Sequence, residues 1–261
     1  MSRRFLIGAN VKMNQTPAES VQFFTGIADA VRLQLPDAPP VQLYLALPFT
    51  SLPALARQAI GSPIWVSAQN VHWEAEGAYT GEISARMLTA VGVRLVLIGH
   101  AERRQLGHET EVETNRKVMA ASAAGLNVLL CVGETAEERG YGVGPQTVDR
   151  QLRIALHGLA PDLLSFIHLA YEPVWSIGVG GTPATPADIT PIINDMRRTM
   201  VTLFGEAGDS VPILYGGSVN AENAGTFAGL REVDGLLVGR AGWTVDGFLG
   251  VLKAAVSARS S

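Results

Sequence analysis

The feature that most constrains this chain is a set of eight short apolar runs, separated by longer segments in which apolar residues recur at helical spacing. Each run has the length of a strand and is apolar almost throughout, which is typical of parallel strands buried on both faces. The runs are Phe5–Ala9, Val41–Leu47, Ile64–Ala68, Leu95–Ile98, Val128–Val132, Ile167–Tyr171, Val211–Tyr215 and Gly235–Val238.

The intervening segments predict helices. Apolar residues between Val21 and Leu35 fall on one helical face, and residues 189–203 and 245–256 show the same period. A helix start is also visible in the sequence. Thr185 suits an N-cap, Pro186 the first helical position, and Asp188 the first turn.

Eight strand–helix alternations within about 250 residues predict an α/β fold, a (β/α)₈ TIM barrel. The rival is a doubly wound open sheet, whose glycine-rich fingerprint should follow the first strand. Here Asn10 to Asn14 follow that strand without a glycine. Because no linker or composition shift interrupts the pattern, we expect residues 1–261 to form one catalytic domain. The proline-rich stretch from Leu35 to Pro40 predicts a loop between elements.

Composition narrows the class of partner. The net charge of −4 gives no sign of a nucleic-acid footprint, although a local basic cleft for an anion remains compatible with it. The single cysteine, Cys131, excludes an intramolecular disulfide and fits a reducing compartment. No apolar run approaches the roughly 18 residues of a membrane span, and the first run is too short for a signal sequence. We therefore expect a cytoplasmic protein that binds neither nucleic acid nor membrane.

In a (β/α)₈ barrel the reactive side chains come from the carboxyl ends of the strands. Those positions hold Asn10 and Lys12 after the first strand, His100 after the fourth and Glu172 after the sixth. The chain has three lysines against seventeen arginines. A lysine directly after a buried strand can aim a compact positive charge at a bound anion. Its alternative role is an ordinary solvated surface lysine.

His100 and Glu172 each allow a structural interpretation and a functional one. His100 is either a satisfied buried histidine or, at an expected helix N-terminus, a neutral imidazole that donates to a carbonyl. Glu172 follows an apolar strand, where an unpaired carboxylate would be costly to bury. It is either part of a structural ion pair or a general base.

Glycine turns follow the last two strands, at Gly216 to Ser218 and at Gly239. Barrel enzymes often bind phosphate there through backbone N–H groups. The stretch from Gly178 to Gly181 resembles a nucleotide-binding loop but lacks the lysine of a P-loop.

Taken in order, these residues resemble the triosephosphate isomerase family over nearly the whole chain, from Phe5 to about Leu252. The motifs that carry the resemblance are Asn10-Val-Lys-Met-Asn14, Ala68-Gln-Asn70, Thr80-Gly-Glu82, Gly99-His-Ala-Glu-Arg-Arg104, Cys131-Val-Gly-Glu134, Ala170-Tyr-Glu-Pro-Val-Trp175, Tyr215-Gly-Gly-Ser-Val219 and Val233-Asp-Gly-Leu-Leu-Val-Gly239.

The resemblance implies a site that isomerises a small phosphorylated sugar through an enediol. It makes Glu172 the base, neutral His100 the electrophile and Lys12 the third catalytic residue. Asn10 would hold the substrate, and Glu102 would support the lysine.

The resemblance also implies a phosphate site at Gly178, Ser218, Gly239 and Arg240, and a lid from Pro173 to about Gly180. It implies a homodimer in which Thr80 reaches the neighbouring subunit. No metal or organic cofactor is expected, and the five histidines show no ligand spacing.

The chain departs from the family pattern at several points. Val11 replaces a tryptophan and Ala101 a serine. In the lid, Val179 replaces a threonine, Gly181 occupies the region of the usual lysine, and Pro183 looks inserted. Arg240 stands where a second glycine is usual.

These departures leave three functions open. The first is triosephosphate isomerase, which interconverts dihydroxyacetone phosphate and glyceraldehyde 3-phosphate in glycolysis and gluconeogenesis. The alternative is an erythrulose-phosphate isomerase with the same chemistry, which would convert L-erythrulose 1-phosphate to D-erythrulose 4-phosphate. Arg240 before Trp243, and His72 with Trp73, resemble that branch of the family. The third is a non-catalytic phosphosugar-binding protein.

Overall fold

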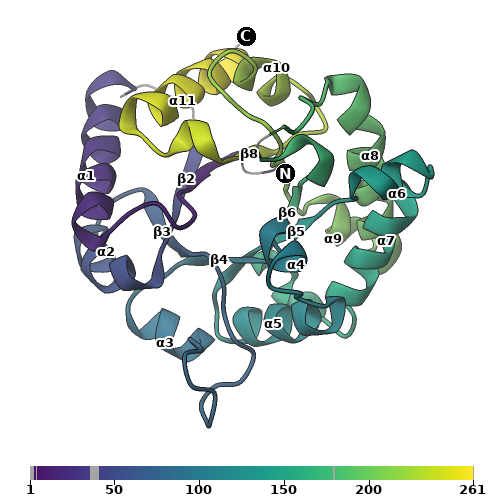
Figure 1. The fold of residues 1–261 in the computed structure, drawn as a ribbon, viewed down its shortest axis with the longest axis horizontal. Coiled ribbons are helices and arrows are strands. Elements are labelled where there is room, and N and C mark those ends of the chain that lie inside the picture. The colour runs from purple at the N-terminus through teal and green to yellow at the C-terminus, as the bar shows by residue number, and fades with distance from the viewer. Residues whose placement is uncertain (1–2, 4, 36–40, 179, 261) are drawn as a thin grey trace.

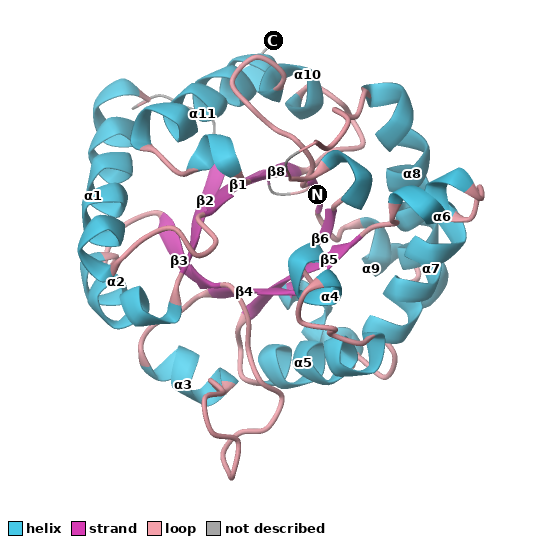
Figure 2. Ribbon diagram, viewed as in Figure 1, coloured by secondary structure: helices cyan, strands magenta, loops and turns pink. Residues whose placement is uncertain are grey.

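A computed structural model describes residues 3, 5–35, 41–178 and 180–260. Eight parallel strands close into a barrel in the order β1 to β8, and the helices form a ring around it (Figures 1 and 2). The elements are β1 (Phe5–Asn10), α1 (Pro17–Gln34), β2 (Val41–Leu47), η1 (Phe49–Ser51), α2 (Leu52–Gln58), β3 (Ile64–Ala68), α3 (Ala85–Ala90), β4 (Leu95–Ile98), α4 (Ala101–Gln105), α5 (Glu111–Ala123), β5 (Asn127–Val132), α6 (Ala136–Gly140), α7 (Gly144–Ala155), η2 (Pro161–Phe166), β6 (Ile167–Tyr171), η3 (Val174–Ser176), α8 (Pro186–Phe204), α9 (Glu206–Asp209), β7 (Ile213–Tyr215), α10 (Ala224–Ala228), β8 (Gly235–Val238), η4 (Arg240–Gly242) and α11 (Val245–Ser260).

The closed parallel barrel confirms the predicted fold class, and every predicted strand is present. The prediction was wrong about the start of β7, which begins at Ile213 rather than Val211. Pro212 has no N–H to donate to the ladder, although its carbonyl accepts from Leu169. The predicted start of α8 is confirmed, because Thr185 and Asp188 form a capping box and Pro186 is the first helical residue. The loop predicted at Leu35–Pro40 falls mostly outside the described residues.

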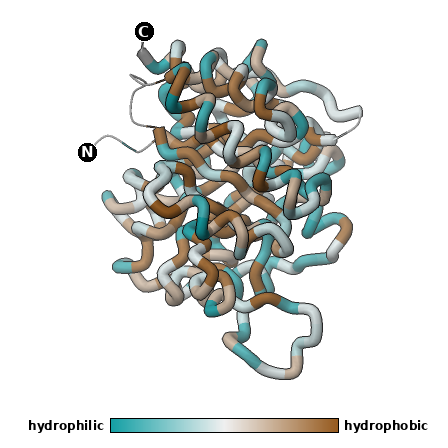
Figure 3. Tube along the Cα trace, turned by 90° about the vertical axis from the view of Figure 1, so that its left-hand side faces the viewer, coloured by the Kyte–Doolittle hydropathy of each residue, from teal (hydrophilic) through white to brown (hydrophobic). Residues whose placement is uncertain are grey.

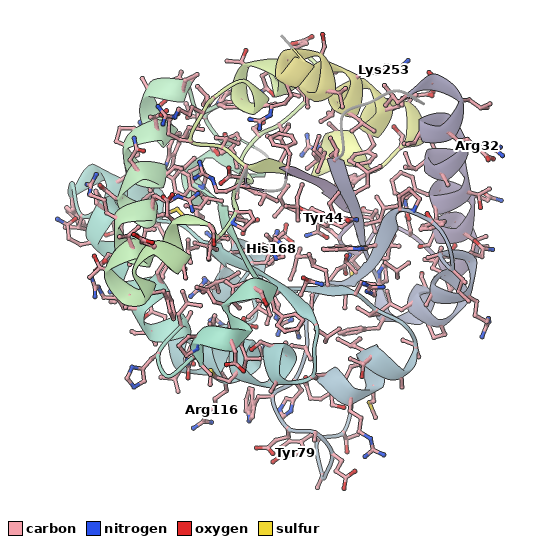
Figure 4. The ribbon with its side chains drawn as sticks, turned by 180° about the vertical axis from the view of Figure 1, so that it is seen from behind. Arg32, Tyr44, Tyr79, Arg116, His168 and Lys253 are labelled. Atoms are coloured by element: carbon pink, nitrogen blue, oxygen red, sulfur yellow. The ribbon has the colours of Figure 1, made fainter. Side chains whose placement is uncertain are left out.

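Side chains fill the barrel interior. Tyr44 on β2 packs against Gly8 on β1, where an added Cβ would lie only 2.2 Å from the tyrosine ring. The Tyr44 hydroxyl reaches the carbonyl oxygen of Leu236 on β8 at 3.4 Å. Viewed from behind, Tyr44 lies in the middle of the molecule (Figure 4). Since the barrel is packed rather than hollow, a substrate has access to the strand ends and their loops, not to the interior.

A second apolar core lies between the strands and the surrounding helices. One loop, residues 69–84 between β3 and α3, extends beyond the helical ring (Figure 1). From the side this loop is mostly pale or hydrophilic (Figure 3). Its base is closed by the backbone N–H of His72, which donates to the Ile83 carbonyl at 2.8 Å. Within the described part of the chain, no helix has the length and apolarity needed to cross a membrane.

Candidate active site

His100 and Glu172 meet at the carboxyl end of the barrel. Gly99 separates His100 from the end of β4, and Glu172 directly follows β6. Because all eight strands run parallel, both residues emerge at the same end. His100 Nε2 lies 3.2 Å from Glu172 Oε1, and the two side chains are 7% and 3% exposed. The structure therefore brings together two predicted residues that stand 72 positions apart in the sequence.

The hydrogen bonds of His100 identify its tautomer. His100 is the N-cap of α4, and its Nδ1 accepts the backbone N–H of Glu102 at 3.2 Å. A ring nitrogen that accepts a hydrogen bond carries no proton. In this arrangement the imidazole is therefore neutral and its proton is on Nε2, the nitrogen that faces Glu172.

The second oxygen of Glu172 is also held. Its Oε2 accepts the backbone N–H of Ala101 at 3.1 Å. Ala101 is the first residue of α4, where N–H groups have no partner within the helix. Alanine replaces the usual serine at position 101, but Glu172 keeps its donor because the hydrogen bond comes from the backbone N–H and not from the side chain.

Lys12 occupies a constrained turn after β1. Its φ is +54°, in the left-handed region that residues other than glycine seldom adopt. The Lys12 backbone N–H donates to Asn10 Oδ1 at 3.0 Å, and Lys12 Nζ contacts Glu102 Oε1 at 2.5 Å. Asn10 is therefore a support for the lysine turn, and Glu102 is the ionic partner of the lysine.

Two residues that sequence reasoning did not assign to the site hold this turn in place. Gln69 Nε2 donates to the Lys12 carbonyl at 2.9 Å and to Asn10 Oδ1 at 3.2 Å. Trp243 Nε1 donates to the Asn10 carbonyl at 3.1 Å. Both lie far from the turn in sequence, and the signals for Gln69 were its place after a strand end and its membership of the Ala68-Gln-Asn70 motif.

A cavity of about 460 Å³ opens beside these groups. Its lining includes Lys12, Gln69, His100 and Glu102, together with the highly exposed Met13. The volume suits a small ligand. A compact cation and a polar imidazole thus face a common space at the carboxyl end of the barrel.

The proposed phosphate residues lie on the neighbouring part of the rim. Ser218 follows β7, and Gly239 follows β8 as the N-cap of η4. Both Ser218 and Arg240 are exposed. The Arg240 side chain has no hydrogen bond or ion pair to another residue in the part of the chain that the structure describes. Gly178, with φ of +85°, lies beyond η3 in the expected lid.

The start of the expected lid is tied to the barrel by Glu134. Its buried carboxylate accepts from the Tyr171 hydroxyl at 2.9 Å and from Trp175 Nε1 at 2.7 Å. Burial, followed by the adjacent Glu134 charge, raises the pKa of Tyr171 well above its ordinary value. The Arg139 guanidinium lies 3.6 Å above the Trp175 ring. Lid residue Val179 lies outside the described residues.

Thr80 is exposed on the loop of residues 69–84 that extends from the barrel. Within that loop, the His72 ring stacks on Trp73 at 4.2 Å between centroids and packs against Tyr79 at 4.6 Å. No cluster of metal-ligating side chains is formed by the residues with a described position.

Comparison with known proteins adds independent information. The family model for triosephosphate isomerase matches residues 5–255. Triosephosphate isomerase of Acetivibrio thermocellus is 41% identical over 254 residues, covering 97% of this chain and 99% of the relative. That of Rhodopirellula baltica is 39% identical over 259 residues, covering 99% and 100%. The crystal structure of triosephosphate isomerase from Bartonella henselae superimposes with a TM-score of 0.86 at 35% identity, over 96% of this chain and 98% of that one. The chain therefore belongs to the triosephosphate isomerase family and is an isomerase.

Proposed function

We propose that this isomerase interconverts dihydroxyacetone phosphate and glyceraldehyde 3-phosphate, with Glu172, His100 and Lys12 as its catalytic residues. The observation that carries this assignment is the contact of 3.2 Å between His100 Nε2 and Glu172 Oε1. It places a carboxylate next to a neutral N–H donor at the mouth of the barrel, which is the pairing that enediol chemistry requires.

The proposed reaction needs one base and one donor. Glu172 removes a proton from the carbon next to the substrate carbonyl, and the electron pair moves onto the carbonyl oxygen. His100 Nε2–H donates to that oxygen, and the Lys12 ammonium stabilises its developing charge. The hydroxyl proton on the carbon that was deprotonated then passes to the former carbonyl oxygen by way of His100 Nε2, and Glu172 returns its proton to the former carbonyl carbon. No atom is gained or lost, so the product is an isomer.

The hydrogen bonds of Glu172 bear on how the reaction begins. Both of its oxygens are engaged, one by His100 and one by Ala101 N–H. To reach a substrate carbon, Glu172 exchanges these contacts for the substrate. That movement also frees the His100 Nε2–H, so binding prepares the base and the electrophile together.

We place the substrate phosphate among Gly178, Ser218, Gly239 and Arg240, near backbone N–H groups of turns and of a short helix start. Asn10 holds the lysine turn, and Glu102 supports the lysine. The segment from Pro173 to about Gly180 is the proposed lid. The hydrogen bond from Trp175 to Glu134 anchors the amino end of this lid to the barrel.

An assay of both candidate substrates tests the choice between triose and tetrulose. Dihydroxyacetone phosphate and L-erythrulose 1-phosphate are supplied separately at equal concentrations, and isomer formation is followed by NMR. We expect kcat/KM for the triose to be at least tenfold higher. A preference for the tetrulose would overturn the proposed substrate while leaving the enediol mechanism in place.

We further propose that residues 1–261 act as one catalytic domain within a cytoplasmic homodimer. The loop bearing Thr80 protrudes from the barrel. The cavity of about 460 Å³ beside Lys12 is open, and Met13 at its edge is 96% exposed. In the proposed dimer, the loop of one copy packs against this cavity of the other. The single buried Cys131 fits a reducing compartment. Sedimentation velocity at micromolar concentration tests the dimer, and a monomer at that concentration would refute it.

A further inference from the structure

Gly99, which directly precedes His100, is held at both its backbone N–H and its carbonyl by charged side chains, the buried Glu109 and the partly buried Arg104. Glu109 Oε1 accepts the Gly99 backbone N–H at 3.1 Å. Arg104 Nε donates to the Gly99 carbonyl at 2.8 Å, and Arg104 Nη2 reaches the Cys131 carbonyl on β5 at 3.3 Å. Gly99 has φ of +72°, and a Cβ there would lie 2.8 Å from Arg104 Nη2. The Arg104 guanidinium therefore packs directly against the Gly99 backbone.

Glu109 is itself firmly fixed. Its side chain is 2% exposed. Its Oε2 accepts from Arg103 Nε at 2.7 Å and pairs with Lys117 Nζ, which also donates to Asn70 Oδ1 at 2.9 Å. Burial alone would raise the pKa of Glu109, but the hydrogen bonds from Lys117 and Arg103 outweigh it, so the pKa lies below its ordinary value. Glu109 is thus a charged acceptor, which forms a stronger bond to Gly99 than a neutral one would.

Two contacts in the site, one made by His100 and one by Ala101, depend on the conformation of the Gly99 backbone. His100 follows Gly99 directly, and its ring caps α4 through the Glu102 N–H. The next N–H along, that of Ala101, binds Glu172. A rotation of the Gly99 backbone would therefore turn the His100 imidazole and, with it, displace the Ala101 N–H that donates to Glu172.

We propose that Glu109 and Arg104 are positioning residues for the isomerisation, which act by fixing the Gly99 peptide and through it His100. This inference rests on the proposed catalytic role of His100. A misplacement of about 1 Å at a reacting group can cost on the order of 10²-fold in rate. Neither residue needs to touch the substrate to have that effect.

The test uses Arg104→Lys and Glu109→Gln in the full-length enzyme, each alone and combined with His100→Gln. Arg104→Lys keeps the charge but loses the fork that spans two carbonyls. Glu109→Gln keeps the shape but loses the charge. We expect each single variant to lower kcat at least tenfold with KM within about twofold. In the His100→Gln background we expect no further loss, because residues that act as a unit are not additive.

Asp234→Asn is the matched control. Asp234 is a buried carboxylate at the opposite end of the barrel, where it pairs with Arg3 at 2.7 Å and Arg197 at 2.7 Å. We expect the Asp234→Asn substitution to lower the Tm of the enzyme without changing kcat per folded molecule. This separates a loss of stability from a loss of positioning.

Several outcomes would overturn the inference. One is a loss of kcat that is equally large with and without His100, and another is an unchanged kcat in the single variants. If Glu109→Gln does not fold, Arg104→Lys still decides the question. A His100→Gln enzyme with full activity would refute the role of His100 itself, which is a failure of the proposed function and is distinguishable from the other two results.

Discussion

The backbone N–H of Ala101 donates to Glu172 Oε2 at 3.1 Å, across 71 positions of sequence. The first residue of a helix after β4 thus holds the carboxylate that follows β6. Both belong to short segments at the carboxyl end of the barrel. The base and the electrophile of the proposed reaction are therefore coupled through one helix start, since His100 caps the same helix.

Glu172→Asp tests the base. Shortening the side chain retracts the carboxylate by about 1 Å, and a displacement of that size can cost on the order of 10²-fold. We expect kcat to fall by about that factor, with a much smaller change in KM, in steady-state assays with dihydroxyacetone phosphate. Near-normal kcat would remove Glu172 from the role of base.

Lys12→Arg tests whether the lysine charge must be compact. Lys12 sits in a left-handed turn with its Nζ against Glu102 at 2.5 Å. A planar guanidinium is larger and has a different hydrogen-bonding geometry. We expect most activity to be lost, chiefly through a higher KM for the phosphorylated substrate. Lys253→Arg is the control, because Lys253 bonds Gln34 on the outside of the barrel. An active Lys12→Arg enzyme would identify Lys12 as an ordinary surface charge.

Arg240→Gly tests substrate choice. The Arg240 side chain is exposed beside the proposed phosphate site, without a described polar partner that would fix it elsewhere. If it shapes the substrate end, its removal shifts the ratio of kcat/KM for triose and tetrulose phosphates toward the triose. Differences of one carbon group are worth about 1–3 kcal/mol in an apolar pocket, so the shift should be measurable. An unchanged ratio would assign Arg240 to the rim and leave lid residues 179–183 to explain any selectivity.

Tyr215→Phe tests the response of stability to alkaline pH. Burial raises the pKa of Tyr215 to about 12 in the folded chain, against about 10 when unfolded. Between these values the unfolded state releases a proton that the folded state retains, so the stability present below pH 10 is lost as pH rises toward 12. The free energy of unfolding, measured with urea at each pH across this range, should fall less steeply with pH in the variant, by up to about 1.4 kcal/mol per pH unit. Parallel profiles for the two proteins would contradict the expectation.

The sequence by itself determined the barrel and the main residues at its mouth. Eight apolar runs of strand length allowed few arrangements other than a closed parallel sheet. A parallel barrel gathers the residues that follow its strands at one end, so the sequence alone is enough to place Lys12, His100 and Glu172 together. The start of α8 was equally readable, because the cap of Thr185 and Asp188 is a local interaction.

Apart from Glu102, which the family resemblance already implied, only the tertiary structure decided which groups support those residues. Gln69 and Trp243 hold the Asn10–Lys12 turn from 57 and 233 positions away, and Glu109, on a loop, accepts the Gly99 N–H. The donor to Glu172 is a main-chain N–H, which every residue but proline carries and no sequence pattern marks. Such contacts have no local signature, because their geometry exists only once the barrel has closed and fixed the distances between strand ends.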